Sequence, residues 1–529
     1  MFKFKRRRRP VWQPSMISRL GGFVKNVLKH LTFKRVVVAV FVLPLFFYIY
    51  REVSHDALII EPFSVPKRFE ESGLTPEVVS NRIGEALRQI ETDANTRIKK
   101  DNLMSLRDEG AMPDVDIPGT KLGLKTLVEI TREILGIHLK HIGGDIVILA
   151  SGEPSASEQQ LRVTVYITQG RERSQAASLV LNTDDIDKLA QATAEAVLQQ
   201  VNPYMLAKYR YEHHELEKAE IIVQGIVRDQ SADRAHVAAA FNLWGIMRSD
   251  VRKYDEAIAK YKKAIEQNPK FALAYSNWGN VLDRQGKYDE AIGEYAEAVK
   301  IDSKYASAYY GWGRVFVEQR RYDAAAVKLN QAIELDPNSA VYYDGLARVL
   351  QLQHKNDEAI AKYAKAVELD PKDAFAYTSW GDVLYEQKKY DEAIAKYEKA
   401  VEVYPKDAIS YYDWGIALYE QKKYDEAIAK YEKAIELDPK SADYYDSLGR
   451  VLQLQQRNDE AAAKYAKAVE LDPRDVFAYS NWGNVLNEQN KYGKAITKFE
   501  KAIEINQKAP DVYHSWGWYK ENMMTGCRN

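Results

Sequence analysis

The chain has almost no cysteine: Cys527 is the single one among 529 residues. One thiol excludes an internal disulfide framework and any zinc or iron–sulfur site built on cysteine. Charge of either sign is not in excess, since 75 Lys and Arg stand against 76 Asp and Glu. The chain as a whole therefore lacks the field that would recruit nucleic acid or acidic substrates.

Catalytic and cofactor motifs are also missing. There is no P-loop, no G-x-G-x-x-G after a strand and no G-x-S-x-G elbow. The stretch HHELEK at residues 213–218 lacks the second histidine that a zinc helix needs four residues on. His138 and His141 form an isolated pair beside a Gly–Gly pair that we expect to form a turn. We expect them on the surface and not as metal ligands. We predict no enzymatic activity, no cofactor and no metal.

Long hydrophobic runs are rare, and the one at residues 36–50 holds 15 residues without a charge. At about 1.5 Å per residue it spans roughly 22 Å, which flanking basic residues and terminal tyrosines can extend toward the thickness of a bilayer core of about 30 Å. A buried core helix would not follow the basic run at residues 3–9, and a cleaved signal peptide would need an A-x-A site. We predict a transmembrane anchor.

The segment before this anchor is strongly basic. Residues 1–35 contain 11 Lys and Arg and no Asp or Glu. Because positive charge stays on the cytoplasmic side, we expect residues 1–35 in the cytoplasm and the bulk of the chain across the membrane. The basic, roughly amphipathic residues 16–33 are expected on the anionic leaflet.

The sequence pattern of residues 52–202 is typical of a small α/β domain. The patterns predict a strand and turn at 57–66, a helix begun by Thr75 as N-cap and Pro76, and a loop over 91–120. Later elements are a helix at 124–136, strands at 145–152, 161–168 and 178–181, and a helix at 184–201. This order predicts a compact α+β domain. With Pro62–Phe63 ending the first strand and Ser151–Gly152 before an alternating strand, the domain also resembles the N-terminal domain of the translocation protein TolB, found beside repeats in membrane-anchored bacterial signalling and envelope proteins.

From about residue 235 the chain repeats itself with a 34-residue period. A glycine, which we expect to end a helix, recurs at Gly245, Gly279, Gly313, Gly381, Gly415, Gly449 and Gly483, with Ala347 in the fourth copy. An alanine recurs with the same period from Ala257 to Ala495, and a proline closes most copies. The pattern W-x₂-L-G…A-x₃-F…P at this period resembles the tetratricopeptide repeat (TPR) family.

The resemblance implies a mainly α fold, a right-handed solenoid of helix–turn–helix repeats, preceded by the transmembrane helix and the small α+β domain. Eight repeats fill residues 235–508, residues 203–234 form a degenerate leading repeat or linker, and residues 509–529 a terminal helix. Each repeat is too small to bury its own apolar face, so neighbours stack. The aromatic residues at regular spacing, such as Tyr275, Trp278 and Tyr295, are expected to fill the space between helices.

The resemblance also implies a concave groove lined by first helices. Family positions two, five, six, nine and twelve of each repeat select the candidate partner-binding residues Ser276, Asn277, Asn280, Asp344, Arg348, Asp382, Tyr412, Asp446, Arg450, Ser480, Asn481 and Asn484. The same positions include Asp283, Gln351, Thr378, Tyr385, Asp413, Tyr419, Gln453 and Asn487. Trp518 in the terminal helix also falls on a groove position, as a docking or self-association residue or as ordinary end packing.

A longer, 102-residue period overlies the first. YSNWGNVL occurs at residues 275–282 and again, two such periods later, at 479–486, and RVLQLQ begins at Arg348 and again, one period later, at Arg450. One interpretation is duplication of a three-repeat block. The other is that the repeated Asn and Ser side chains grip an extended partner.

These patterns together predict a non-catalytic, single-pass bacterial inner-membrane scaffold. Its groove would bind proteins or peptides for envelope assembly or signalling, with no nucleic-acid partner. The alternatives are an enzyme that acts through residues 52–202, and a regulatory relative of cyclase-type signalling proteins without the catalytic module.

Overall fold

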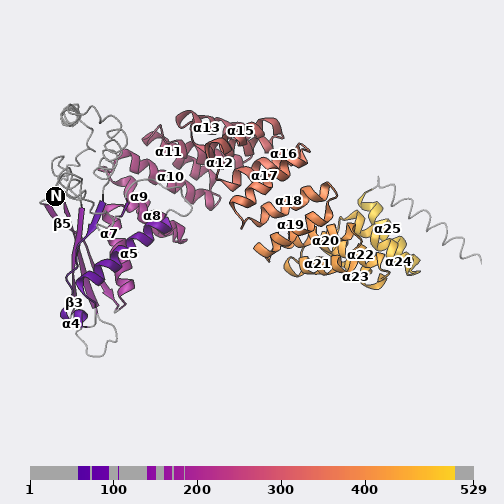
Figure 1. Ribbon diagram of the computed structural model, residues 1–529, viewed down its shortest axis with the longest axis horizontal. Coiled ribbons are helices and arrows are strands. Elements are labelled where there is room, and N and C mark those ends of the chain that lie inside the picture. The colour runs from indigo at the N-terminus through magenta and orange to yellow at the C-terminus, as the bar shows by residue number, and fades with distance from the viewer. Residues whose placement is uncertain are drawn as a thin grey trace, which may run out of the picture. The chain divides into compact units, whose positions relative to one another are not determined.

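The computed structural model describes residues 57–71, 74–94, 105–106, 140–149, 160–169, 172–183 and 185–506, which form a small α/β domain and a series of paired helices (Figure 1). The chain divides into two compact parts, residues 1–274 and residues 275–529. The anchor predicted at 36–50 and the helix predicted at 509–529 lie outside the described residues. Among the described helices, none has the length and apolar character needed to cross a membrane.

A five-stranded mixed sheet forms the centre of the α/β domain, in the order β2-β1-β3-β4-β5. Strand β1 pairs in parallel with β2 and β3, whereas β3, β4 and β5 pair antiparallel. The strands are β1 (Ala57–Ile60), β2 (Ser105–Leu106), β3 (Lys140–Leu149), β4 (Gln160–Gln169) and β5 (Glu172–Asn182). The helices beside them are α4 (Lys67–Glu71), α5 (Pro76–Ala94) and α7 (Ile186–Val201).

The core of this domain lies between one face of the sheet and helices α5 and α7. On β4 the predicted alternation is confirmed, since Leu161, Val163 and Val165 are buried and Arg162 is exposed. Helix α5 contributes buried residues three or four positions apart, the spacing of a single helical face: Val79, Ile83, Leu87, Ile90 and Ala94. Its predicted start is also confirmed, because Thr75 Oγ1 accepts a hydrogen bond from the Val78 amide (3.4 Å) and Pro76 is the first helical residue.

Two local expectations for this domain were wrong. Gly143 and Gly144 lie inside β3 rather than in a turn, paired with Tyr166 and Val165. A Cβ on Gly144 would lie 2.3 Å from the Phe63 ring and 2.4 Å from the Thr164 carbonyl oxygen, so this glycine allows the buried Phe63 ring to pack on the strand. The predicted loop 91–120 contains the end of α5 and the short strand β2. The helix predicted at 124–136 lies outside the described residues.

Helix α8 (Pro203–Glu212) belongs to two hydrophobic cores at once. Its residues Met205 and Leu206 pack in the core of the α/β domain. Tyr204, Ala207 and Tyr211 pack in a second core with α9 (Leu216–Arg228) and α10 (Arg234–Asp250). Only Asn202 separates α7 from α8, and the Arg210 guanidinium bridges Glu195 of α7 and Glu215 before α9. The segment 203–228 is therefore a packed helical pair.

The remaining helices alternate between the first and the second helix of successive pairs, beginning with α10. The first helices after α10 are α12 (Ala272–Arg284), α14 (Ala306–Glu318), α16 (Ala340–Leu352), α18 (Ala374–Glu386), α20 (Ala408–Glu420), α22 (Ala442–Leu454) and α24 (Val476–Glu488). The second helices are α11 (Tyr254–Gln267), α13 (Tyr288–Ile301), α15 (Tyr322–Leu335), α17 (Asn356–Leu369), α19 (Tyr390–Val403), α21 (Tyr424–Leu437), α23 (Asn458–Leu471) and α25 (Tyr492–Ile505). We number these pairs as repeats 1 to 8.

The sequence suggested that the glycines of the 34-residue period end helices, and this expectation was wrong. Each lies inside a first helix, where a large second-helix side chain packs against it, an aromatic ring at every one except Gly313. A Cβ added to Gly415 would lie 2.6 Å from the Tyr431 ring, and one on Gly483 would lie 2.6 Å from the Phe499 ring. Both rings are fully buried. The alanines of the same period are also fully buried, which confirms that small residues let the two helices approach.

The turn between the two helices of a repeat holds one residue in the left-handed region. The position recurs once in each repeat, with φ values between 58° and 71°: Arg252, Gly286, Arg320, His354, Lys388, Lys422, Gln456 and Asn490. Most second helices then begin with an Asp–Glu pair in the first turn, as predicted for the positive end of a helix dipole. Turn and helix start thus keep the same geometry from repeat to repeat.

Two glycine substitutions should have opposite effects on stability. Gly415→Ala places a methyl group against the buried Tyr431 ring and should lower the free energy of unfolding by roughly 1–3 kcal/mol. Gly293→Ala is the matched control, because Gly293 lies inside α13 with no atom near its missing Cβ. It should raise stability by about 0.5–1 kcal/mol through helix propensity. Urea unfolding followed by circular dichroism measures both; equal effects would contradict the role given to Gly415.

Candidate functional site

Within residues 275–529 the first helices of successive repeats lie next to one another, and we call the surface that they form the first-helix face. Besides the pairing within repeats, α14 contacts α16, α16 contacts α18, α18 contacts α20, and α22 contacts α24. Because first helices approach each other more closely than second helices do, this face is the inner side of the stack. The candidate residues selected from the sequence lie on these helices, except Trp518, which lies outside the described residues.

Tyrosines of the second helices lie beneath this face and reach it with their hydroxyl groups. Tyr295 donates a hydrogen bond to Asn280 Oδ1 (2.7 Å) and Tyr397 to Asp382 Oδ1 (3.0 Å). Burial raises the pKa of both hydroxyls above their ordinary value, so they remain protonated donors. The same arrangement joins Tyr363 to Gln351 Oε1 (3.4 Å) and Tyr465 to Gln453 Oε1 (3.2 Å).

Some candidate residues are occupied by contacts inside the array. Ser276 is only 3% exposed, so it cannot contact a partner while α12 is folded. Thr378 is likewise buried, and its hydroxyl lies 2.6 Å from the Ser410 hydroxyl in the next repeat. Asn277 lies in the same helix as Ser276, half-buried, and Tyr412 bonds Ser447 across repeats (3.1 Å). These side chains contribute more to stacking than the sequence alone indicated.

The identical motifs at 275–282 and 479–486 differ in what lies beneath them. In repeat 2 the Tyr295 hydroxyl uses Asn280 as its acceptor. In repeat 8 the corresponding residue is Phe499, which has no hydroxyl, and within the described residues Asn484 makes no hydrogen bond. Asn484 is half-buried and Ser480 beside it is too. Of the two copies, the second therefore presents the freer amide.

The residues repeated at 102-residue spacing also have unequal partners. Asp446 Oδ1 accepts a hydrogen bond from Asn481 Nδ2 (3.2 Å) in the next repeat. The counterpart of Asp446 in repeat 4 is Asp344, and the counterpart of Asn481 in repeat 5 is Ser379. Asp344 Oδ1 is buried without a hydrogen-bond partner among the described residues. Arg450 donates to the Tyr419 hydroxyl (3.3 Å). Arg348 is exposed.

Carboxyl groups on this face are held away from water. Burial raises the pKa of Asp344, Asp382 and Asp446 from 3.8 to about 6. Asp413 has the largest shift: burial first, and then the neighbouring carboxylates of Asp382 and Asp407, raise its pKa to about 8. The first-helix face thus carries groups that ionise near neutral pH.

A ladder of glutamine–aspartate hydrogen bonds, which the sequence analysis did not predict, joins successive repeats from repeat 2 to repeat 8. In every case a glutamine just after a first helix donates from Nε2 to the aspartate in the first turn of the preceding second helix. The pairs, 2.7–3.0 Å apart, are Gln319–Asp289, Gln353–Asp323, Gln387–Asp357, Gln421–Asp391, Gln455–Asp425 and Gln489–Asp459. Their constant separation along the chain was visible in the sequence and is the signal that could have found them.

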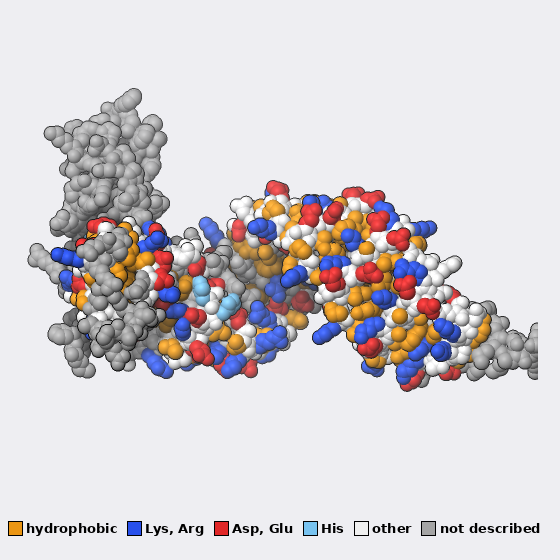
Figure 2. Space-filling view, turned by 90° about the horizontal axis from the view of Figure 1, so that it is seen from below, with side chains coloured by type: hydrophobic (Ala, Val, Ile, Leu, Met, Phe, Trp, Pro, Cys, Tyr) orange, Lys and Arg blue, Asp and Glu red, His pale blue; other side chains and the backbone are white. Residues whose placement is uncertain are grey.

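Second helices carry a different recurring contact. A lysine lies over the ring of the first-helix tryptophan of the same repeat, with Nζ 3.1–3.8 Å from the ring centroid. The pairs are Lys260–Trp244, Lys328–Trp312, Lys396–Trp380, Lys430–Trp414 and Lys498–Trp482. Figure 2 shows Lys and Arg mixed with Asp, Glu and hydrophobic side chains over the face that it presents.

Family models match most of the paired helices. Models described as tetratricopeptide repeat match residues 310–374, 378–442 and 442–475, and one described as TPR repeat matches residues 253–286, 279–319 and 483–518. Within the matched residues, the helical pairs have the pattern of tetratricopeptide repeats. The TPR array was thus correctly predicted from the period and the small-residue pattern; its right-handed sense remains a prediction.

Solved TPR structures resemble parts of the chain. YrrB, a TPR protein with an unusual peptide-binding site, is 28% identical, with 34% of this chain and 92% of YrrB covered and a TM-score of 0.30. MamA from Desulfovibrio magneticus RS-1 is 24% identical over 32% of this chain and 96% of MamA, with a TM-score of 0.31. The C-terminal part of a TPR protein from Cytophaga hutchinsonii is 18% identical, with 45% of this chain and 97% of that structure covered and a TM-score of 0.39. No curated protein sequence matches significantly.

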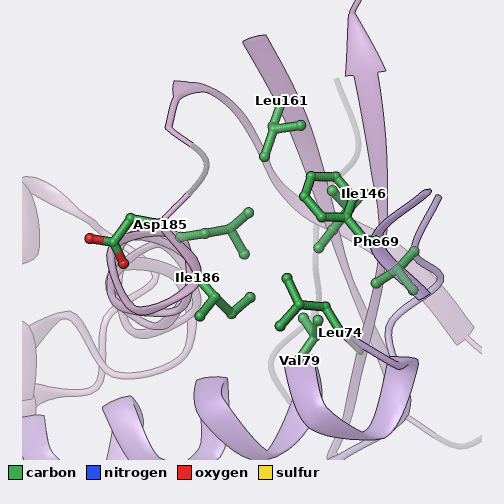
Figure 3. A pocket seen from close by; sticks show the side chains of 9 residues that line it. Phe69, Leu74, Val79, Ile146, Leu161, Asp185 and Ile186 are labelled. Carbon is green, nitrogen blue, oxygen red and sulfur yellow. The ribbon is translucent and has the colours of Figure 1, made fainter. Parts of the chain in front are cut away.

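Outside the TPR array, the α/β domain has a small apolar pocket. It is lined by Val65, Phe69, Leu74, Val79, Ile146, Leu161, Asp185, Ile186 and Leu189. Figure 3 shows aliphatic side chains and the Phe69 ring pointing into it, and the Asp185 carboxylate pointing away. That carboxylate caps α7, accepting from the Asp187 and Lys188 amides. The described part of the pocket therefore lacks convergent polar groups.

The histidines noted in the sequence form ordinary pairs. His141 Nδ1 lies 3.0 Å from Glu61 Oε1, and His213 Nδ1 lies 2.9 Å from the Tyr209 carbonyl oxygen. Among the residues that the structure describes, no group of three or more His, Cys, Asp or Glu could hold a metal ion. Trp518 and Cys527 lie outside the described residues, as does His138.

The raised pKa values predict a stability that falls as pH rises. Between about pH 4 and pH 8 the folded TPR array binds protons at Asp413 that the unfolded chain has lost, so each increase in pH favours unfolding. Asp413→Asn should therefore raise the thermal midpoint at pH 8 and leave it almost unchanged at pH 4. Glu420→Gln, an exposed site on the same helix, is the control and should not alter the difference between the two pH values.

Proposed function

We propose that this protein is a membrane-anchored scaffold whose TPR array holds partner proteins or peptides on the first-helix face. The observation that carries the proposal is that face itself. It presents half-buried and exposed polar groups in register along successive helices, among them Arg348, Arg450 and Asn484. Stacked repeats extend such a surface without interruption, which suits an extended partner.

The membrane part of the proposal comes from the sequence. An apolar segment at 36–50 behind a segment of 11 basic residues favours a single-pass anchor with the N-terminus in the cytoplasm. The small domain and the TPR array would then lie across a bacterial inner membrane and serve envelope assembly or signalling. A topology reporter fused after residue 529 tests this orientation.

The enzymatic alternative finds little support in the described α/β domain. An active site there would need polar groups that converge on a pocket, and the described lining of the pocket is apolar. A regulatory role for this domain, without catalysis, is compatible with its packing against α8. The resemblance of residues 52–202 to the TolB N-terminal domain favours that role.

Site-specific photocrosslinking tests the proposed face. A photoreactive amino acid replaces Asn484 on the first-helix face in one variant and the exposed Glu398 on second helix α19 in the control. We expect discrete crosslinked products in intact cells from position 484 and not from position 398. Equal crosslinking from both positions, or from position 398 alone, would show that partners do not use the first-helix face.

A further inference from the structure

One face of the five-stranded sheet carries no helix among the described residues. Helices α4, α5, α7 and α8 all contribute side chains to the core on the opposite face, which we call the core face. The other face, which we call the open face, includes Val147, Arg162 and Val180 in one row, because Arg162 pairs with Val147 of β3 and with Val180 of β5. Val147 is 50% exposed and Val180 is 54% exposed. Apolar side chains therefore lie on both faces of this sheet.

The parallel part of the sheet is the part that most needs a second layer. Strands β2, β1 and β3 run parallel, and parallel strands occur almost only where both of their faces are covered. Strand β1 is apolar on both faces. Ile60 packs against the core, whereas its neighbour Ile59, paired with His141, faces the open side. We therefore expect a further element over β1 and β3.

One connection of the chain can supply this element. Residues 107–139, which lie outside the described residues, join the end of β2 at Leu106 to the start of β3 at Lys140. Since β2 and β3 are both parallel to β1, which lies between them, the connection must return along the sheet and pass over β1. Parallel strands are joined by crossovers of a dozen or more residues, usually through a helix.

The handedness of crossovers determines the face on which this connection passes. Crossovers between parallel strands are right-handed in about 98% of cases. The first crossover runs from β1 through α5 to β2, and α5 lies on the core face. The second runs from β2 past β1 to β3, in the reverse direction across the sheet. Two crossovers of the same hand in opposite directions lie on opposite faces, so the second belongs on the open face.

The core face is also already occupied. Helix α5 contacts β1 and β2, and helix α7 contacts β4 and β5. The two helices also contact each other and share one core with the sheet. A further helix over β1 on this face would have to displace α5. Occupancy and handedness thus exclude the same face for independent reasons.

The sequence of the connection suits the open face. In the helix predicted at 124–136 the apolar residues and one threonine share a side, at Leu124, Leu127, Val128, Thr131, Ile134 and Leu135. The charged residues Lys125, Glu129, Arg132 and Glu133 lie on the remaining surface. Only residues 137–139 separate this helix from β3, a length common for helix-to-strand loops. The helix would therefore run antiparallel to β3, beside the start of that strand.

We infer that residues 124–136 form a helix that docks on the open face of the sheet, over β1 and β3, with its apolar side toward Ile59 and Val147. The occupant of this face is a segment of the chain itself, and that part of the sheet is not free to bind a partner. The small domain then has three layers: the docked helix, the sheet, and helices α5 and α7. The inference concerns the small domain and does not depend on the scaffold function.

Cysteine crosslinking in the purified full chain, in non-ionic detergent, tests the inference. At about 1.5 Å per helical residue and about 3.3 Å per strand residue, Leu124 lies roughly level with Val147. In a Cys527→Ser background, a short bismaleimide should join Leu124→Cys to Val147→Cys. It should not join Leu124→Cys to Glu85→Cys, an exposed position on α5 at the core face. Crosslinking to position 85 instead, to both positions or to neither would overturn the inference.

The rate at which maleimide labels Ile59→Cys gives a second test with different substitutions. Leu127→Asp places a charge on the apolar side of the predicted helix and should raise this rate by roughly ten- to hundred-fold, because the docked state is lost. Lys125→Asp introduces the same residue on the charged side and is the matched control, with no change expected. Labelling of Val180→Cys on β5, an exposed position, should be the same in both variants.

The labelling test also has outcomes that contradict docking. Equal labelling of Ile59→Cys in the Leu127→Asp and Lys125→Asp variants would show that this helix does not cover β1. A rise at both Ile59→Cys and Val180→Cys would show general unfolding of the domain, and circular dichroism checks this directly. In that case the crosslink between positions 124 and 147, which needs neither aspartate, decides: its absence overturns the inference.

Discussion

The packing of one aromatic ring against one glycine is the contact on which every other feature of the array depends. A repeat of two short helices has little apolar surface, and the rings of Tyr295, Tyr397 and Tyr431 occupy almost all the space between its helices. Glycine beneath the ring brings the helices to the distance at which the ring fills the gap. Repeats 3 and 4 show the tolerance of this arrangement, since Leu329 packs on Gly313 and Ala347 replaces the glycine beside Tyr363.

This core contact also determines which groups a partner could meet. A tyrosine ring that crosses the repeat ends in a hydroxyl at the opposite surface, and that hydroxyl needs an acceptor. Asn280 and Asp382 accept these hydrogen bonds within their own repeats. Phe499 has no hydroxyl, so Asn484 accepts no such bond. The residue type in the core thus decides which side chains on the first-helix face are already hydrogen-bonded. The hydroxyl oxygen of Tyr295, which Phe499 lacks, is the difference between the bonded Asn280 and the unbonded Asn484.

Much of the fold could be predicted from the sequence, because the signals are local and repeated. The 34-residue period, the alternation on β4 and the cap at Thr75 are of this kind.

The errors concern contacts between distant residues. Gly144 was expected in a turn because the Phe63 ring that covers it comes from another segment, and strand β2 was missed because so short a strand carries no pattern of its own. The glycines of the period were found but misread, since only the structure shows the ring above them. Likewise the candidate site residues could be placed on the correct helices, but Ser276 and Asp344 differ in exposure and partners for reasons that no spacing reveals.

The double membership of helix α8 has a consequence for how the first part of the chain unfolds. Met205 and Leu206 cannot leave the sheet domain without exposing apolar surface there, and Tyr204, Ala207 and Tyr211 on the same helix hold the first helical pairs. Melting α8 therefore breaks both cores at once, and the ion pairs of Arg210 with Glu195 and Glu215 break with it. We therefore expect the small domain and the leading helices to unfold as one cooperative block, and a chain that begins within α8 would lack side chains of both cores.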